Sequence, residues 1–186
     1  MPAEDALLQQ IKNKSVYHKY VYTTAGTSWW YNTYSQKVLF TFTLLGSGGL
    51  GGNGGAFCGG TAGKSGQLQI GTDTVISSSS IKIVIGSTAV IQYDNISGTM
   101  TQTASVGNPG VSNSYFGSAI GENASATPFS GGPTGGQPTI DGESGIQYGY
   151  GAGGGGGGQS GDGGQTGGHG GSGGPALVIL ETWEPY

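Results

Sequence analysis

The chain has 186 residues, of which 42 are glycine and 34% are hydrophobic, with six lysines, no arginine and ten acidic residues. So few cations cannot form the basic patch that neutralises phosphates, which argues against nucleic-acid binding. The single cysteine, Cys58, excludes an intrachain disulfide, and the length suits one domain with a small appendage.

The chain opens with a predicted short helix over residues 2–12. Pro2 suits the first helical turn, acidic residues follow it, and Leu7, Leu8 and Ile11 fall on one side. A helix of about three turns is marginal alone. We therefore expect its apolar side to dock on another surface.

An aromatic hairpin is predicted next, from strands at residues 16–23 and 28–34. Adjacent residues of a strand point to opposite faces, so one of Trp29 and Trp30 is expected to face the core or a partner. We interpret the cluster Trp29, Trp30 and Tyr31 as a docking interface. A carbohydrate platform is the alternative, because aromatic faces stack on sugars.

The strand predicted at residues 38–45 leads directly into a glycine-rich stretch, and glycine recurs every third residue from Gly155 to Gly173. A period of three is that of an extended helix of the polyproline II type, and glycine lets such helices approach until their backbones hydrogen-bond. A flexible linker is the alternative. The apolar strand that follows anchors the stretch and favours the ordered form. Further strands are predicted at residues 67–70, 81–85, 89–93, 100–104 and 176–183.

Together these elements predict an all-β protein. Its fold is a small β-sandwich with glycine-rich connections of the polyglycine II helical type, a short N-terminal helix and the aromatic hairpin. Two units are expected: residues 1–36 as an N-terminal attachment segment, and residues 37–186 as a glycine-rich β/polyglycine domain.

No motif indicates chemistry. Residues 58–65 approach a phosphate-binding loop, but a strand-like segment follows where that loop needs a helix. The two histidines, His18 and His169, lack a ligand set, and Asp141 and Glu143 lack an identifiable catalytic partner. We therefore expect no enzyme, no metal and no cofactor.

Large side chains interrupt the glycine pattern near residues 145–151. Recognition commonly lies in loops on a rigid scaffold. The aromatic residues expected to contact a receptor are Tyr115, Phe116, Phe129, Tyr148 and Tyr150. The alternative is that these residues cap the ends of the glycine helices, and the sequence leaves both open.

The order of elements across residues 37–186 resembles the glycine-rich domains at the distal ends of bacteriophage tail fibres. It comprises the strand at 38–45, glycines over 46–66, strands over 67–86, Ser-Tyr-Phe-Gly at 114–117, Ser-Gly-Gly at 130–132, a long glycine run and a strand ending in Trp183. The resemblance implies β-strands combined with a sandwich of polyglycine II helices, whose loops bind the bacterial surface.

The resemblance thus implies a virion protein, assembled in the host cytoplasm and forming a tail-fibre tip or receptor-binding adhesin. Its partners would be a host-surface glycan or outer-membrane protein. Association of its own copies, as in a trimer, would cover further strand edges. Neither a signal peptide nor a membrane span is expected. The residues expected to attach to another virion protein are Leu7, Leu8, Ile11, Trp29, Trp30 and Tyr31. The alternatives are a capsid-decorating or cementing protein and an ice-binding protein.

Overall fold

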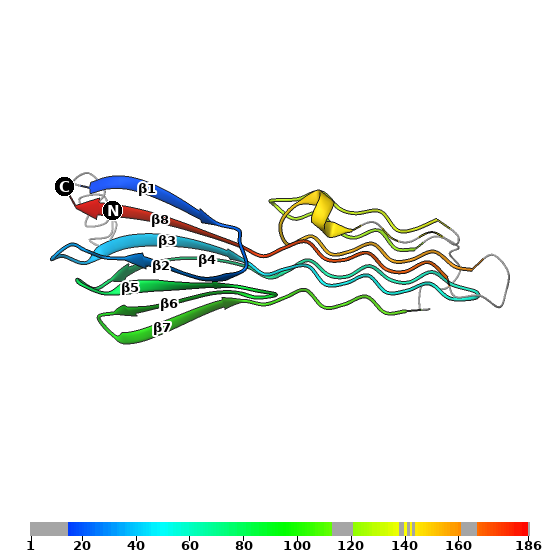
Figure 1. Ribbon diagram of the computed structural model, residues 1–186, viewed down its shortest axis with the longest axis horizontal. Helices are drawn as coiled ribbons and strands as arrows, with labels where there is room; N and C mark the ends of the chain where they lie inside the picture. Colours follow the sequence, from blue (N-terminus) through cyan, green and yellow to red (C-terminus); the bar gives the residue numbers. More distant parts are fainter. Residues whose placement is uncertain are drawn as a thin grey trace, which may run out of the picture.

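A computed structural model describes residues 15–112, 121–137, 140, 142, 144–160 and 167–185. The expected N-terminal helix, with Leu7, Leu8 and Ile11, and the expected contact residues Tyr115 and Phe116 lie outside this part. Figure 1 shows strands gathered at one end and long glycine-rich segments running from them. The elements are β1 (Ser15–Tyr22), β2 (Gly26–Tyr31), β3 (Val38–Leu45), β4 (Leu68–Val75), β5 (Ser80–Ile85), β6 (Ala89–Asn95), β7 (Gly98–Ala104), the 3-10 turn η1 (Gly145–Tyr148) and β8 (Leu177–Pro185).

The strands form two four-stranded antiparallel sheets, in the orders β1-β8-β3-β4 and β2-β5-β6-β7. This arrangement confirms the predicted all-β fold with a small sandwich. The apolar strands β3 and β8 lie side by side in the middle of the first sheet, where both of their edges are paired. Central strands suit such apolar runs because burial removes the most side-chain surface from water.

The predicted aromatic hairpin is wrong, although both of its strands exist. β1 pairs along its length with β8, whereas β2 pairs with β5 in the other sheet. The chain passes from one sheet to the other between β1 and β2. Trp30 of β2 therefore joins the core from one side, while Tyr20 and Tyr22 of β1 pack against that core from the facing sheet. A hairpin would have kept these aromatic side chains in one sheet. The described residues 15–31 are therefore part of the sandwich itself.

The core lies between the sheets. Phe40 is fully buried, and its ring meets that of Tyr93 edge-on with centroids 4.8 Å apart. Trp30 belongs to the same cluster, so its expected role in an attachment surface is wrong. The alternation of a strand explains this burial, because Trp30 points inward while its neighbours Trp29 and Tyr31 point outward.

Glu184 is a nearly buried acid at the end of β8. Its carboxylate accepts hydrogen bonds from the hydroxyls of Tyr20 (3.0 Å), Tyr34 (3.1 Å) and Thr182 (2.7 Å). Burial raises the pKa of this carboxyl, but these hydrogen bonds and the nearby His18 outweigh burial and leave the pKa below its ordinary 4.5. The charged form is therefore the one that the fold stabilises.

We predict that Glu184 makes stability depend on pH in the acidic range. Because its pKa is lower in the folded chain, its contribution is complete above pH 4.5 and is lost as the pH falls through the folded-state value. Thermal melting across this range should show a smaller loss of Tm for Glu184→Gln than for the wild type. Parallel curves for the two proteins would contradict the assignment.

The segments that leave the sandwich form the second part of the structure, which we call the glycine bundle. It comprises the described residues of 46–66, 105–112, 121–160 and 167–175. Its segments are extended and lie side by side (Figure 1). Main-chain hydrogen bonds join them with a step of three residues, as shown by Gly48 N to Gly174 O, Gly51 N to Gly171 O and Gly54 N to Gly168 O, at 2.8–2.9 Å. Backbone groups that a β-sheet would satisfy in a plane are here satisfied by several neighbouring segments.

Glycine is required in the bundle by close approach of backbones. A Cβ on Gly154 would lie 1.9 Å from the carbonyl oxygen of Gly171, and a Cβ on Gly157 would lie 1.9 Å from that of Gly168. At the positions of the repeat that face outward, larger side chains fit, as at the exposed Leu50 and Asn53. The period of three therefore separates contact positions from surface positions.

Candidate functional site

The glycine bundle has two ends with different surroundings. At the proximal end, Gly46 continues β3 and Pro175 leads into β8 (Figure 1). At the distal end the chain turns back through residues 55–58, where Gly55 N donates to Cys58 O at 2.9 Å.

The distal end also gathers residues that border the undescribed segments 113–120 and 161–166. Asn53 N donates to Ser112 Oγ at 3.1 Å, and Ser160 N donates to Gly55 O at 2.8 Å. Gly54 N donates to Gly168 O at 2.9 Å on the other side. Three separate stretches of sequence thus meet at the end furthest from the sandwich.

Phe57 is the prominent side chain of the distal turn, with 81% of its surface exposed. Its sequence neighbours are Ala56 and the buried Cys58, flanked by glycines, so nothing large beside it in the turn can cover the ring. The turn carries no charged residue between positions 53 and 60. Sequence reasoning missed Phe57, although a single large apolar residue among small ones was the available signal.

Three expected receptor-contact residues lie together at the other end of the bundle. Gly131 N donates to Tyr148 O at 3.1 Å, and Thr127 Oγ1 donates to Tyr150 O at 2.9 Å, which holds the turn bearing Phe129 against η1. The next residue after Tyr150, Gly151, donates to Pro175 O beside β8. Phe129 is partly exposed, while Tyr148 and Tyr150 are half-buried. Their contact with a receptor stays a prediction.

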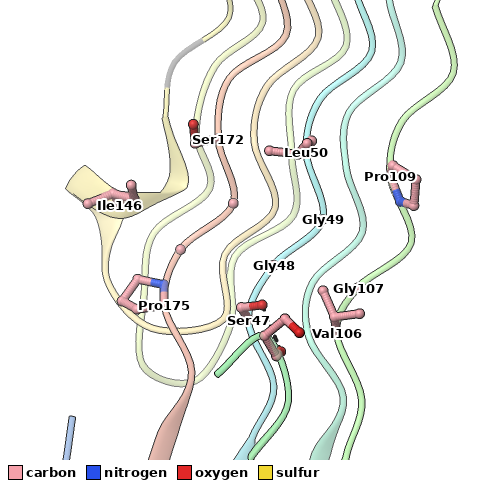
Figure 2. Close-up of a pocket in the computed structure, with 13 residues that line it drawn as sticks. Ser47, Gly48, Gly49, Leu50, Val106, Gly107, Pro109, Ile146, Ser172 and Pro175 are labelled. Atoms are coloured by element: carbon pink, nitrogen blue, oxygen red, sulfur yellow. Dashed lines mark hydrogen bonds between the residues drawn. The ribbon is translucent and has the colours of Figure 1, made fainter. Parts of the chain in front are cut away.

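An open apolar groove of about 490 Å³ lies beside the proximal end (Figure 2). Glycines of residues 48–49 and 173–174 form part of its lining, and the side chains of Leu50, Val106 and Ile146 are exposed around it. None of the described residues that line it is titratable. The groove therefore offers apolar contact and main-chain groups but no acid or base.

The remaining expected contact residues, Trp29 and Tyr31, project from the outer face of the sheet β2-β5-β6-β7. Their ring centroids are 6.4 Å apart with an angle of 19° between the planes. Lys82 Nζ lies 5.8 Å from the centroid of the Trp29 ring, a cation–π contact. Their role in virion attachment stays a prediction.

Within the described ranges, no three His, Cys, Asp or Glu side chains converge as a metal site would require. No helix in the same ranges has the length and apolar character to cross a membrane. No protein-family model matches the chain, and the comparison with curated proteins found no match.

Proposed function

We propose that the protein is a non-enzymatic structural protein of a bacteriophage virion, a tail-fibre tip or adhesin that contacts the host surface with the distal end of the glycine bundle. The observation that carries this proposal is the lateral hydrogen bonding of the bundle with a three-residue step. That step supports assigning the segments to the polyglycine II type, in which extended helices with three residues per turn bond to their neighbours.

The glycine bundle can act as a rigid support for a contact surface at its end. Its backbone N–H and C=O groups form hydrogen bonds with neighbouring segments, so the bundle needs few apolar side chains to stay ordered. These bonds join main-chain groups, so side-chain changes in the turns do not remove their donors or acceptors, and recognition surfaces often combine loops with a rigid support. The exposed ring of Phe57 supplies an aromatic anchor of the kind that dominates many interfaces.

The opposite end of the molecule suits attachment to the virion. Ser15 and Pro185 pair with each other there, at the end of the sandwich away from the bundle (Figure 1). The described part of the chain therefore begins at this end of the sandwich. We propose that Leu7, Leu8 and Ile11 contact another virion protein, while the distal end contacts a host glycan or outer-membrane protein and copies of the chain associate.

Adsorption of the purified chain to a panel of bacterial strains tests the proposal. We expect Phe57→Ala to weaken binding to a susceptible strain about tenfold, because loss of an aromatic anchor typically costs more than about 1 kcal/mol. The matched control is Tyr17→Ala, which removes an exposed aromatic side chain from β1 of the sandwich, away from the bundle. We expect this control to bind like the wild type.

Equal binding of the wild type and Phe57→Ala would remove the distal turn from the contact. Failure of the wild type to bind any strain would contradict the adhesin function. In that case, labelling the chain on intact particles and imaging them by electron microscopy would show whether it decorates the capsid.

A further inference from the structure

The outer face of the sheet β2-β5-β6-β7 carries an aromatic pair that the sandwich does not use. Trp29 is 48% exposed and Tyr31 is 62% exposed, and both point away from the core because Trp30 between them points into it. The two rings are near-parallel and belong to one strand, β2, at the edge of the sheet. They form a continuous aromatic border along that edge.

Polar side chains continue from this border across the whole sheet. The register places Trp29 opposite Lys82, Lys82 opposite Gln92, and Gln92 opposite Thr101. Directly paired residues share a face, so an indole, an ammonium, an amide and a hydroxyl form one row. With strands about 4.8 Å apart, this row spans roughly 14 Å.

The polar groups of this row remain available. In the part of the chain that the structure describes, Lys82, Gln92 and Thr101 form no side-chain hydrogen bond or ion pair, and Lys82 makes only its contact with the Trp29 ring. Gln92 and Thr101 are exposed. Their donors and acceptors therefore face solvent beside an aromatic surface.

We propose that this face is a carbohydrate-binding site for a pyranose glycan. The apolar C–H face of a sugar ring stacks on Trp29 and Tyr31. Its hydroxyls accept hydrogen bonds from Lys82, and they donate to and accept from Gln92 and Thr101. A pyranose combines one apolar face with a polar rim, which matches an aromatic border beside polar groups. The centre of a protein interface is instead depleted in charge, whereas the row here has a lysine and an amide at its middle.

This site is independent of the proposed contact at the distal end, because it lies on the sandwich and uses none of the bundle residues. It gives Trp29 and Tyr31 a ligand in place of the virion protein expected from the sequence. A protein partner on the same face becomes an outcome that the experiment distinguishes.

The test uses the full chain on a printed array of bacterial surface polysaccharides and neutral oligosaccharides, followed by titration calorimetry with the glycan bound best. We expect Trp29→Ala and Tyr31→Ala each to weaken that binding about tenfold or more. Gln92→Ala, which removes only the proposed hydrogen bonds between this side chain and the glycan, should weaken the binding less. The matched control is Tyr17→Ala, which removes a 49% exposed aromatic residue from the outer face of the other sheet and should not change binding.

Thermal melting of each variant checks that it is folded, and the exposed Tyr31 and Gln92 carry the test if Trp29→Ala does not fold. Binding of no glycan by the wild type would overturn the proposal. So would glycan binding that Tyr31→Ala and Gln92→Ala leave unchanged. Loss of incorporation into virions in Trp29→Ala and Tyr31→Ala, without glycan binding by the wild type, would identify the face as a protein attachment surface.

Discussion

Gly154→Ala is expected to lower the free energy of unfolding by at least about 3 kcal/mol. This is more than the same methyl group would cost if it met a side chain that could move away. Gly154 donates to Gly49 O and accepts from Gly63 N, both at 2.9 Å, so three segments are joined through this residue. The new Cβ would lie 1.9 Å from Gly171 O in a fourth segment. A main-chain carbonyl cannot rotate away as a side chain can, so the segments would have to separate.

The matched control for Gly154→Ala is Gly86→Ala, in the turn between β5 and β6. A Cβ there meets no atom within 4 Å, and the residue does not need a positive φ. Alanine should stabilise the chain slightly at this position, by about 0.4–1 kcal/mol, because it restricts the unfolded state. Denaturant unfolding followed by circular dichroism should thus give changes in the free energy of unfolding that have opposite signs for the two variants. Equal small effects would show that backbone contact does not hold the bundle together.

Phe40→Ala is expected to destabilise the sandwich by about 3–5 kcal/mol. The Phe40 ring is fully buried between the two sheets and contacts the rings of Phe42 and Tyr93. Truncation removes apolar contacts and leaves a cavity that strands of both sheets border, so collapse around the site is limited. Because the same strands continue into the bundle, the whole chain should unfold at lower denaturant concentration.

Phe57→Ala serves as the control for Phe40→Ala, because it removes the same side chain from an exposed turn. We expect its free energy of unfolding to stay within about 0.5 kcal/mol of the wild type. A loss comparable to that of Phe40→Ala would mean that the distal turn packs on its own chain, which would also weaken its assignment as a contact surface.

Local sequence predicted where strands form but not how they pair. The strand expected at residues 38–45 has those bounds, and the one expected at 81–85 extends by one residue. β4 was expected to end at Ile70, yet it continues to Val75 through Gly71. A Cβ on Gly71 would lie 2.4 Å from the Phe42 ring, so this glycine makes room for a core side chain and does not end the strand.

Pairing and the position of turns along the bundle depend on contacts distant in sequence. β1 and β2 lie next to each other in the chain, yet the burial of Trp30, Tyr20 and Tyr22 between the sheets places these strands in different sheets. In the same way, the aromatic character of Tyr148 and Tyr150 was visible in the sequence, but not the end of the bundle at which they lie. The glycine period shows which residues face outward, but it does not show which residues lie at the end of the bundle away from the sandwich. For this reason the sequence did not single out Phe57.

Native-state amide hydrogen exchange tests the central claim, that the glycine bundle is a stiff support held by its own backbone. Amides at Gly48, Gly51 and Gly54, and at Gly154, Gly157 and Ser160, each donate to a neighbouring segment. These positions should exchange far more slowly than an unstructured glycine chain, as should Gly49, Gly52 and Gly55, which also donate to neighbouring residues of the bundle. Exchange at the unstructured rate throughout residues 151–160, while the amides of β3 and β8 stay protected, would contradict the account.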